Sequence, residues 1–405
     1  MCHIYYDNSM SADIVIVGGG PIGLWAAIQI KSLCPDKTVV VREKHAQYQR
    51  HGIHLRLVPS SFAGCTAESV QPIVQDWKRR HVIPIAEMEQ SLAAIAESVG
   101  VQITRNQEVD PAQILQEFPH ARIVIGADGS HSPMRQHFFA DTYRFMRPLQ
   151  YLVQVQYKVR LSDASQEGCV RSVAEYKKQK FAGHLITQTI RSCGDQTAEI
   201  AMRIFVDKTI YDEMADARFS APYYFETDLH KVPDRLKQVL IRWWGSHPEQ
   251  EILQDEARAN KITVIALAAY SAKQFVQCVQ RPEGGESVAV ALVGDAAQAY
   301  PYFRAINNGL LNATALAIDT ARALQQPPNP TVAPLHRYAR YARFRSIIEL
   351  VTAYVKNFFI HFSNCWIRVS GTVFWESAKL SREEQAACTA RGQLIWDRLS
   401  AQASA

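Results

Sequence analysis

A glycine-rich turn between a short apolar run and a helical segment constrains the fold of this chain more than any other feature. Residues 12–17 read Ala-Asp-Ile-Val-Ile-Val, and Gly-Gly-Gly-Pro-Ile-Gly follows at 18–23. The apolar run predicts a buried parallel strand, and the pattern of residues 22–33 predicts the helix that leaves the turn. Residues 38–41 are again strand-like, so the segment predicts a strand, helix and strand unit of a parallel sheet.

The spacing of three glycines in this turn is typical of a dinucleotide site. Gly18 permits a sharp turn out of the strand, Gly20 lets the backbone approach a pyrophosphate, and Gly23 lets the helix pack close to the sheet. The helix N-terminus offers unpaired N–H groups and a positive dipole end to the phosphates. Glu43 lies twenty residues beyond Gly23, where a carboxylate accepts hydrogen bonds from ribose hydroxyls.

The period of the sequence changes in the middle of the chain. Residues 151–159 alternate apolar and polar side chains, which is typical of an antiparallel sheet with one face in water. We therefore expect an α/β protein with a discontinuous, three-layer Rossmann-like domain. The expected segments are the nucleotide domain at 1–148 and 288–326, an antiparallel substrate domain at 149–287, and a helical C-terminal region at 327–405.

Composition and spacing exclude several classes of protein. The net charge of +5 is small and the basic residues are scattered, so a nucleic-acid partner is not expected. The eight cysteines form no Cys-x-x-Cys pair, and His45, His51 and His54 have no further ligand at suitable spacing, so no metal site is expected. The chain shows no secretory signal and no apolar stretch of about 18 residues, which predicts a cytoplasmic location.

The C-terminal region combines an apolar stripe with basic residues. The apolar side chains recur at helical spacing at Ile347, Val351, Tyr354, Phe358, Phe359 and Phe362. The arginines beside them are Arg337, Arg340, Arg343 and Arg345. Such a stripe usually packs on its own domain, which is the interpretation we prefer. A membrane-surface helix or a helix that binds a partner is the alternative.

Two later motifs complete a resemblance to the flavoprotein monooxygenases of the p-hydroxybenzoate hydroxylase type. The family's Gly-Ala-Asp-Gly-x-x-Ser-x-x-Arg is matched at 126–135. Its Gly-Asp-Ala-Ala, followed by a proline, is matched at 294–297 and Pro301. With the first glycine turn, the resemblance extends over residues 13–324.

This resemblance implies FAD as the cofactor and assigns roles to several residues. Asp295, after Gly294, would bond the ribityl chain of the flavin. Asp128 and Gly129 would hold the segment that touches FAD and the incoming nicotinamide nucleotide. Arg50 lies where family members carry an arginine that reaches the pyrophosphate.

The resemblance also implies a reaction. NAD(P)H reduces the flavin, the reduced flavin captures O2 as a C4a-hydroperoxide, and one oxygen atom passes to an electron-rich, often aromatic, small molecule. No second Gly-x-Gly-x-x-Gly is present for the nicotinamide nucleotide, as in this family. An FAD-binding interaction protein with little turnover is the rival interpretation.

A looser resemblance links residues 41–55 to the flavin domain of MICAL proteins. Those proteins read Glu-Lys-Arg where this chain has Glu43 and Lys44, and their stretch ends in Leu-His-Leu. Lys44 is therefore included among the cofactor-binding candidates. MICAL domains oxidise a protein side chain, so a protein substrate is a second possibility.

The chain departs from the family after Pro301, where a glycine loop normally lies against the flavin ring. Asn307 and Asn308 are the candidates to present backbone N–H groups there, because asparagine tolerates positive φ. Tyr302, Phe303 and Arg304 are candidate pocket residues, and core packing of the two aromatic side chains is the alternative.

Overall fold

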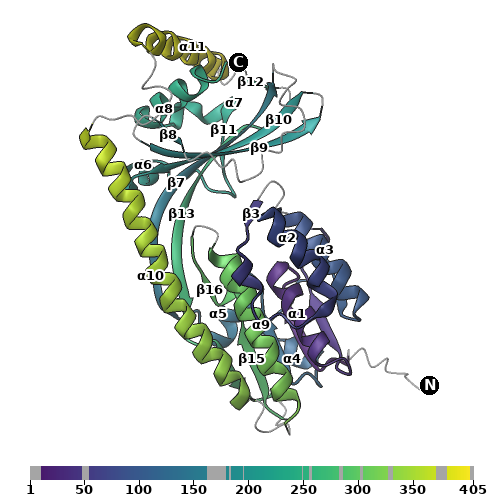
Figure 1. Ribbon diagram of the computed structural model, residues 1–405. Helices are drawn as coiled ribbons and strands as arrows, with labels where there is room; N and C mark the ends of the chain where they lie inside the picture. Colours follow the sequence, from purple (N-terminus) through teal and green to yellow (C-terminus); the bar gives the residue numbers. More distant parts are fainter. Residues whose placement is uncertain are drawn as a thin grey trace, which may run out of the picture. The chain divides into compact units, whose positions relative to one another are not determined.

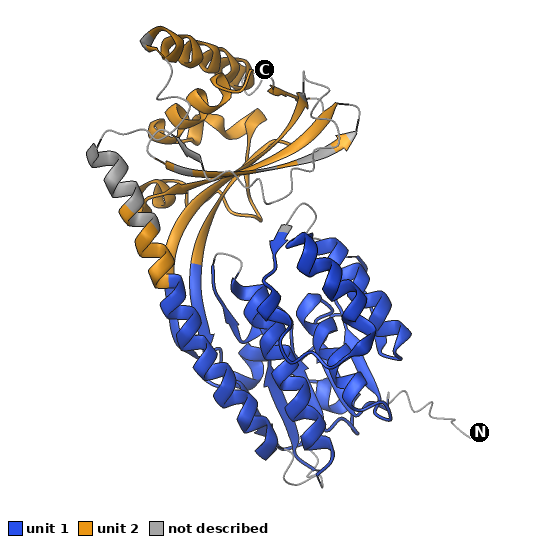
Figure 2. Cartoon of the chain, in the orientation of Figure 1, with its two compact units in different colours: residues 1–147, 268–353 blue, residues 148–267, 354–405 orange. Residues whose placement is uncertain are grey.

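The computed structural model describes most of the chain (Figure 1). The described ranges are 11–47, 54–161, 179–181, 184–194, 196–248, 250–254, 258–281, 286–301, 304–326, 332–370 and 381–401. They fall into two compact units, shown in blue and orange in Figure 2. Unit 1 covers residues 1–147 and 268–353, and unit 2 covers 148–267 and 354–405.

Unit 1 contains a six-stranded mixed sheet with the order β14-β15-β6-β1-β2-β5. The strands are β1 (Ile14–Val17), β2 (Val39–Arg42), β5 (Gln102–Thr104), β6 (Ile123–Gly126), β14 (Val276–Val279) and β15 (Val288–Leu292). All neighbours pair in parallel except β14, which runs antiparallel to β15. Every residue of β1, β6 and β15 is buried, which explains their continuous apolar runs.

The helices of unit 1 that follow these strands include the helix predicted after the glycine turn. They are α1 (Pro21–Leu33), α2 (Gln71–Arg80), α3 (Ile85–Ser98), α4 (Ile114–Glu117), α5 (Pro133–Phe139) and α9 (Arg304–Leu324). α1 packs against α3 and α9, and the indole N–H of Trp25 donates to Thr314 Oγ1 at 2.9 Å. The short strands β3 (His54–Arg56) and β4 (Val82–Pro84) form a separate antiparallel pair. The strand, helix and strand predicted at the N-terminus are confirmed.

Unit 2 is organised by an antiparallel sheet with the order β11-β13-β7-β10-β9-β8. Its strands are β7 (Tyr143–Leu161), β8 (Gln179–Phe181), β9 (His184–Gly194), β10 (Thr197–Val206), β11 (Tyr223–Tyr224) and β13 (Lys261–Ala272), with β12 (Gln250–Ile252) pairing with β7. β7 and β13 have residues in both units. Alternate side chains of β10 are buried and the others are not, so the antiparallel sheet predicted from the alternating sequence is confirmed.

The helices of unit 2 include a pair that is distant in sequence. They are α6 (Lys208–Glu213), α7 (Phe225–Asp228), α8 (Asp234–Gly245) and α11 (Arg382–Ala401). α8 packs against α11, where a Cβ on Gly245 would lie 1.8 Å from the Cys388 carbonyl oxygen. The two helices therefore meet at backbone contact, which only glycine allows.

The long helix α10 (Val332–Ser370) corrects one expectation. The apolar stripe of the C-terminal region does not pack on its own domain, because Ile347, Val351 and Phe358 are 46%, 56% and 64% exposed. The helix instead buries the opposite line of residues, which includes Tyr338 and Ala342. Among the described residues, no helix is both long and apolar enough to cross a membrane.

Candidate active site

Three neighbouring strands bring the glycine motifs to one edge of the unit 1 sheet. β15, β6 and β1 lie side by side and run in parallel, and their carboxyl ends lead to Gly294, Gly126 and Gly18. A Cβ on Gly18 would lie 2.4 Å from the Ala127 carbonyl oxygen, so the first and second motifs are in contact. Parallel sheets of this kind bind their ligands outside the carboxyl ends of the strands.

The three glycines of the first motif differ in what surrounds them. Gly18 has φ +107°, a conformation that favours glycine. A Cβ on Gly23 would lie 2.0 Å from the Gly18 carbonyl oxygen, so this position is filled by backbone. A Cβ on Gly20 would meet nothing within 4 Å. Gly18 and Gly23 are therefore required by the fold, while the space beside Gly20 is open.

The start of α1 has the character of an anion site. Gly20 caps the helix without a side-chain hydrogen bond, and the first turn contains no acidic residue. The N–H groups of the first turn have no intrahelical partner, and they lie at the positive end of the helix dipole.

Glu43 lies beside this turn at the end of β2. Its Oε2 accepts a hydrogen bond from the Gly19 backbone N–H at 2.7 Å, and its Oε1 accepts one from the His45 N–H at 2.8 Å. Lys44 is exposed. Arg50 lies outside the described residues.

Asp128 and Gly129 follow β6. Asp128 Oδ2 accepts a hydrogen bond from the Met134 N–H at 3.0 Å, and Oδ1 is buried without a hydrogen-bond partner among the described residues. Burial raises the pKa of Asp128, and hydrogen bonds from Ser132 and Met134 oppose that rise. Gly129 has φ +86° and open space at its Cβ position, so its backbone conformation favours glycine.

Arg135 ties the second motif to the third. Its side chain is buried, Nη1 donates to the Ala296 carbonyl at 2.8 Å, and Nη2 donates to the Ser130 carbonyl at 2.8 Å. Nε donates to Asp141 Oδ1 at 2.8 Å. The guanidinium lies over the rings of Tyr143 and Tyr270, 4.9 and 5.6 Å from their centroids.

The third motif begins a short 3-10 turn, η6 (Gly294–Ala296). Gly294 has φ +63°, and a Cβ there would lie 3.0 Å from Ile22 Cγ2 in the first turn of α1. The hydroxyl of Tyr270 donates to the Asp295 carbonyl at 2.6 Å, and burial raises the pKa of that phenol. Asp295 is half-buried and follows Gly294 in this turn.

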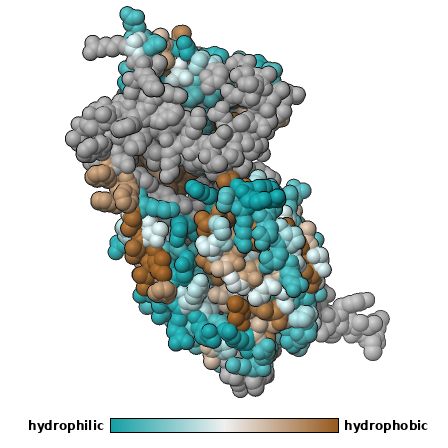
Figure 3. Space-filling model, in the orientation of Figure 1, coloured by the Kyte–Doolittle hydropathy of each residue, from teal (hydrophilic) through white to brown (hydrophobic). Residues whose placement is uncertain are grey.

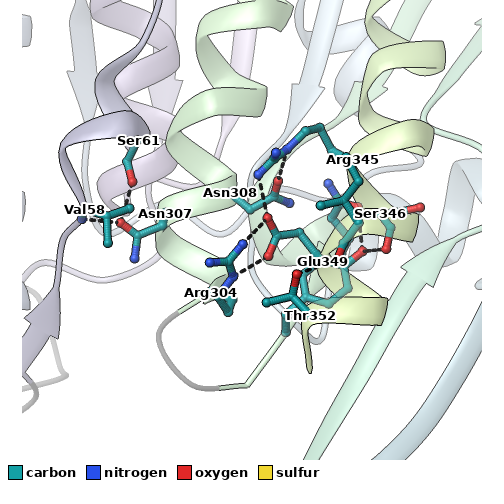
Figure 4. Close-up of polar contacts among 12 residues, drawn as sticks. Val58, Ser61, Arg304, Asn307, Asn308, Arg345, Ser346, Glu349 and Thr352 are labelled. Atoms are coloured by element: carbon teal, nitrogen blue, oxygen red, sulfur yellow. Dashed lines mark hydrogen bonds and ion pairs between the residues drawn. The ribbon is translucent and has the colours of Figure 1, made fainter. Parts of the chain in front are cut away.

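The start of α9 is fixed by Asn307 (Figure 4). Its Oδ1 accepts hydrogen bonds from the Val58 N–H at 2.9 Å and from Ser61 Oγ at 2.5 Å, and its Nδ2 donates to the Arg56 carbonyl at 2.8 Å. Asn308 lies four residues after Arg304 in α9, so its backbone N–H bonds to the Arg304 carbonyl within the helix. The backbone N–H groups left over belong to the first turn of the helix.

A buried carboxylate holds the other side of the same helix (Figure 4). Glu349 on α10 is 1% exposed and accepts two hydrogen bonds from Arg304, at 2.5 Å from Nε and 2.7 Å from Nη2. Arg345 donates to Glu349 Oε1 at 2.5 Å and to Asn308 Oδ1 at 3.3 Å. Arg304 was a candidate pocket residue, but its side chain forms an ion pair with Glu349.

Glu349 was not among the residues that the sequence singled out, although one signal was present. Glu349 is the only acidic residue between 332 and 370, and it stands four residues after Arg345, which is the spacing of a helical ion pair. Of the remaining candidates, Pro301 is buried beside the start of α9, while Tyr302 and Phe303 lie outside the described residues. No group of three metal-ligating side chains occurs in the described part of the chain.

Solved structures share this architecture. CtdE, solved in complex with FAD and a substrate, is 13% identical, with a TM-score of 0.56 over 98% of this chain and 100% of that chain. The Diels-Alderase PyrE3 is 15% identical, with a TM-score of 0.55 over 94% and 80%. The flavin-dependent brominase Bmp2 is 13% identical, with a TM-score of 0.53 over 97% of each.

The chain therefore shares the fold of CtdE, which was solved with FAD, and of the flavin-dependent brominase Bmp2. At these identities the likeness concerns the fold. The sequence matches no protein-family model and no curated protein. The resemblance to the MICAL flavin domain stays a prediction.

Proposed function

We propose that this protein is an FAD-dependent monooxygenase, which uses NAD(P)H and O2 to oxygenate a small electron-rich molecule. The observation that carries the proposal is the meeting of the three glycine motifs at the carboxyl ends of β1, β6 and β15. The shared fold of flavin-dependent enzymes supports it.

The residues at the first motif fit the adenosine half of FAD. The open space at Gly20 is a cradle that a Cβ would fill, and it lies at the uncapped start of α1. Backbone N–H groups there would bind the pyrophosphate. Glu43, whose Oε2 accepts a hydrogen bond from the Gly19 N–H of the turn, would also accept hydrogen bonds from the ribose hydroxyls.

The residues at the second and third motifs fit the rest of the cofactor. Asp295 would accept from the ribityl hydroxyls, because a carboxylate accepts hydrogen bonds and donates none. Arg135 would hold the two motifs at a fixed spacing through Ser130 and Ala296. Bound FAD would supply the redox chemistry, passing electrons from NAD(P)H to O2 and one oxygen atom to the substrate.

The start of α9 would face the ring of the flavin. Asn307 and the Arg304–Glu349 pair fix the first two turns from opposite sides. The N–H groups of Ala305 and Ile306, in the first turn, would then donate to the carbonyl edge of the ring. The first turn of α9 would then take the role that a glycine loop has in the family.

Reconstitution with FAD tests the proposal. We expect the purified chain to bind FAD with a shifted visible spectrum, and to oxidise NADH or NADPH with oxygen consumption above the rate of free FAD. Asp295→Ala should weaken FAD binding. A chain that stays colourless contradicts the cofactor assignment, while bound FAD without any turnover identifies a flavin-binding interaction protein instead.

A further inference from the structure

Helix α10 exposes a continuous line of large apolar side chains. Residues spaced three or four apart share one helix face, and this line consists of Phe344, Ile347, Val351, Val355, Phe358 and Phe362. Their exposed fractions run from 46% at Ile347 to 64% at Phe358. Hydrophobic residues follow the side of Figure 3 on which Figure 1 draws α10.

The opposite face of α10 fixes this orientation. Its buried residues are Leu335, Tyr338, Ala342, Ser346, Glu349 and Ala353. The hydroxyl of Tyr338 donates to the Leu292 carbonyl of β15 at 2.5 Å, and the hydroxyl of Tyr300 donates to the Ser346 carbonyl at 3.2 Å. The ion pairs of Glu349 add a third attachment. The helix therefore cannot turn its apolar line inward without breaking these bonds.

The exposed line is larger than an ordinary surface patch. Tyr341, Tyr354 and Phe359 flank it and are 36%, 45% and 61% exposed. Phe358 lies 5.9 Å from Phe359 and 6.2 Å from Phe362 between ring centroids. Together these side chains expose on the order of 800 Å², whereas the largest apolar patch of a typical monomer is roughly 300–600 Å².

Basic residues continue the same line toward the start of the helix. Arg337 and Arg340 stand seven and four residues before Phe344, so they lie on its face, and both are exposed, as is Arg343. The only acidic residue of α10 is Glu349, which is 1% exposed and paired with two arginines. The exposed face is thus aromatic along most of its length and cationic at one end.

We propose that this face of α10 docks the protein on an anionic membrane surface, with the helix lying in the plane of the interface. Acyl chains would take the aromatic line, and headgroup phosphates would bind Arg337, Arg340 and Arg343. A second copy fits the face less well. Parallel pairing would place Arg340 against Arg340, and antiparallel pairing about Val351 would bury Arg340 against Phe362.

Vesicle flotation of the full chain tests the proposal. We expect little binding to phosphatidylcholine vesicles and strong binding to vesicles of an equimolar mixture with phosphatidylglycerol. Arg337→Glu with Arg340→Glu should lower the partition coefficient at least about 25-fold, at about fivefold per cationic residue lost. Phe344→Ser with Phe358→Ser should lower it at least about tenfold, because two aromatic side chains leave the interface.

Matched controls separate docking from general effects of the substitutions. Phe219→Ser with Leu394→Ser removes two side chains that are 67% and 71% exposed elsewhere. Arg79→Glu with Lys208→Glu reverses two charges whose side chains are 80% and 67% exposed. Both controls should bind the mixed vesicles at least half as well as the original chain, and circular dichroism should show unchanged helix content in all variants.

Several outcomes overturn the proposal. They are failure to bind either vesicle, equal binding to the two vesicle types, and equal loss of binding in the controls. A dimer in vesicle-free solution that Phe344→Ser with Phe358→Ser dissociates would assign the face to a second copy. Flotation uses no FAD and no substrate, so its result is independent of the proposed monooxygenase activity.

Discussion

The starts of α1 and α9 touch each other but are built in opposite ways. A Cβ on Gly309 of α9 would lie 2.8 Å from Ile22 Cδ1 in the first turn of α1. The start of α1 is shaped by backbone, since Gly18 and Gly23 leave no room for a side chain. The start of α9 is shaped by long side chains, through Arg304, Asn307 and their distant partners. A glycine turn can be recognised from neighbouring residues in the sequence. Contacts between side chains that are far apart in the sequence cannot.

The largest expected effect on stability is at the start of α1, which is shaped by backbone. Gly23→Ala would place a Cβ 2.0 Å from the Gly18 carbonyl oxygen and 3.3 Å from Ala127 Cβ, so α1 must move away from β1. We expect the free energy of unfolding to fall by at least about 3 kcal/mol, near the upper range for overpacking. Urea unfolding followed by circular dichroism measures it. A loss below about 1 kcal/mol would show that the contact of α1 with the sheet is not tight.

The second largest effect on stability is expected at the start of α9, which is held by side chains. Glu349→Gln removes the charge shared by Arg304 and Arg345, whose side chains are 26% and 21% exposed. Because an unpaired buried charge is costly, we expect a loss of about 2–3 kcal/mol in the same urea experiment. Asp76→Asn is the matched control, since Asp76 also pairs with two arginines, but its side chain is 35% exposed. The control should cost less than about 1 kcal/mol, and equal losses would mean that burial does not matter here.

Near the start of α1, the buried carboxyl of Glu89 interacts with Glu43. Its ionisation should make the stability of the fold depend on pH. Burial raises the pKa of Glu89 from 4.5 to about 7, Arg105 opposes the rise, and Glu43 adds to it. Well below pH 4.5 the carboxyl is protonated in both the folded and the unfolded state, so its burial does not lower the free energy of unfolding. As the pH rises toward 7, the unfolded chain releases this proton first, so the folded state loses stability.

Glu89→Gln tests this dependence. The glutamine does not titrate, so the variant should gain on the order of 2 kcal/mol relative to the original chain between pH 5 and pH 8. Thermal unfolding across that range measures the difference. If the difference in stability between the variant and the original chain stays constant with pH, Glu89 ionises normally in the folded chain.

The smallest effect on stability belongs to Gly20→Ala, which should nevertheless change binding. The added Cβ meets nothing within 4 Å and the backbone is extended at φ −71°, so the free energy of unfolding should change by less than about 1 kcal/mol. If the pyrophosphate occupies that space, FAD affinity should fall at least about tenfold, since a methyl group would displace it. Fluorescence titration with FAD decides, and unchanged affinity would place the pyrophosphate elsewhere.

The same contrast explains what the sequence could predict. The strand-turn-helix at Gly18 to Gly23, the parallel strands of unit 1 and the antiparallel sheet each follow from a local pattern of apolar residues and glycines, and the structure contains them. The partners of Asn307 and Arg304 lie 246 and 45 residues away in the chain. Such pairs depend on how helices pack, and periodicity alone does not give that information. The exposed face of α10 was misjudged for the same reason, because a stripe does not reveal which face the domain covers.

The hydrogen bonds of Arg135 have a consequence for protein engineering. Its partners Ser130, Asp141 and Ala296, and the rings of Tyr143 and Tyr270, all belong to unit 1. They flank both ends of the inserted block at 148–267. A chimera that exchanges this block for one from another protein would leave these contacts of Arg135 intact. Exchange of the block would thus preserve the link between the second and third motifs, whereas α11 would lose its partner helix α8.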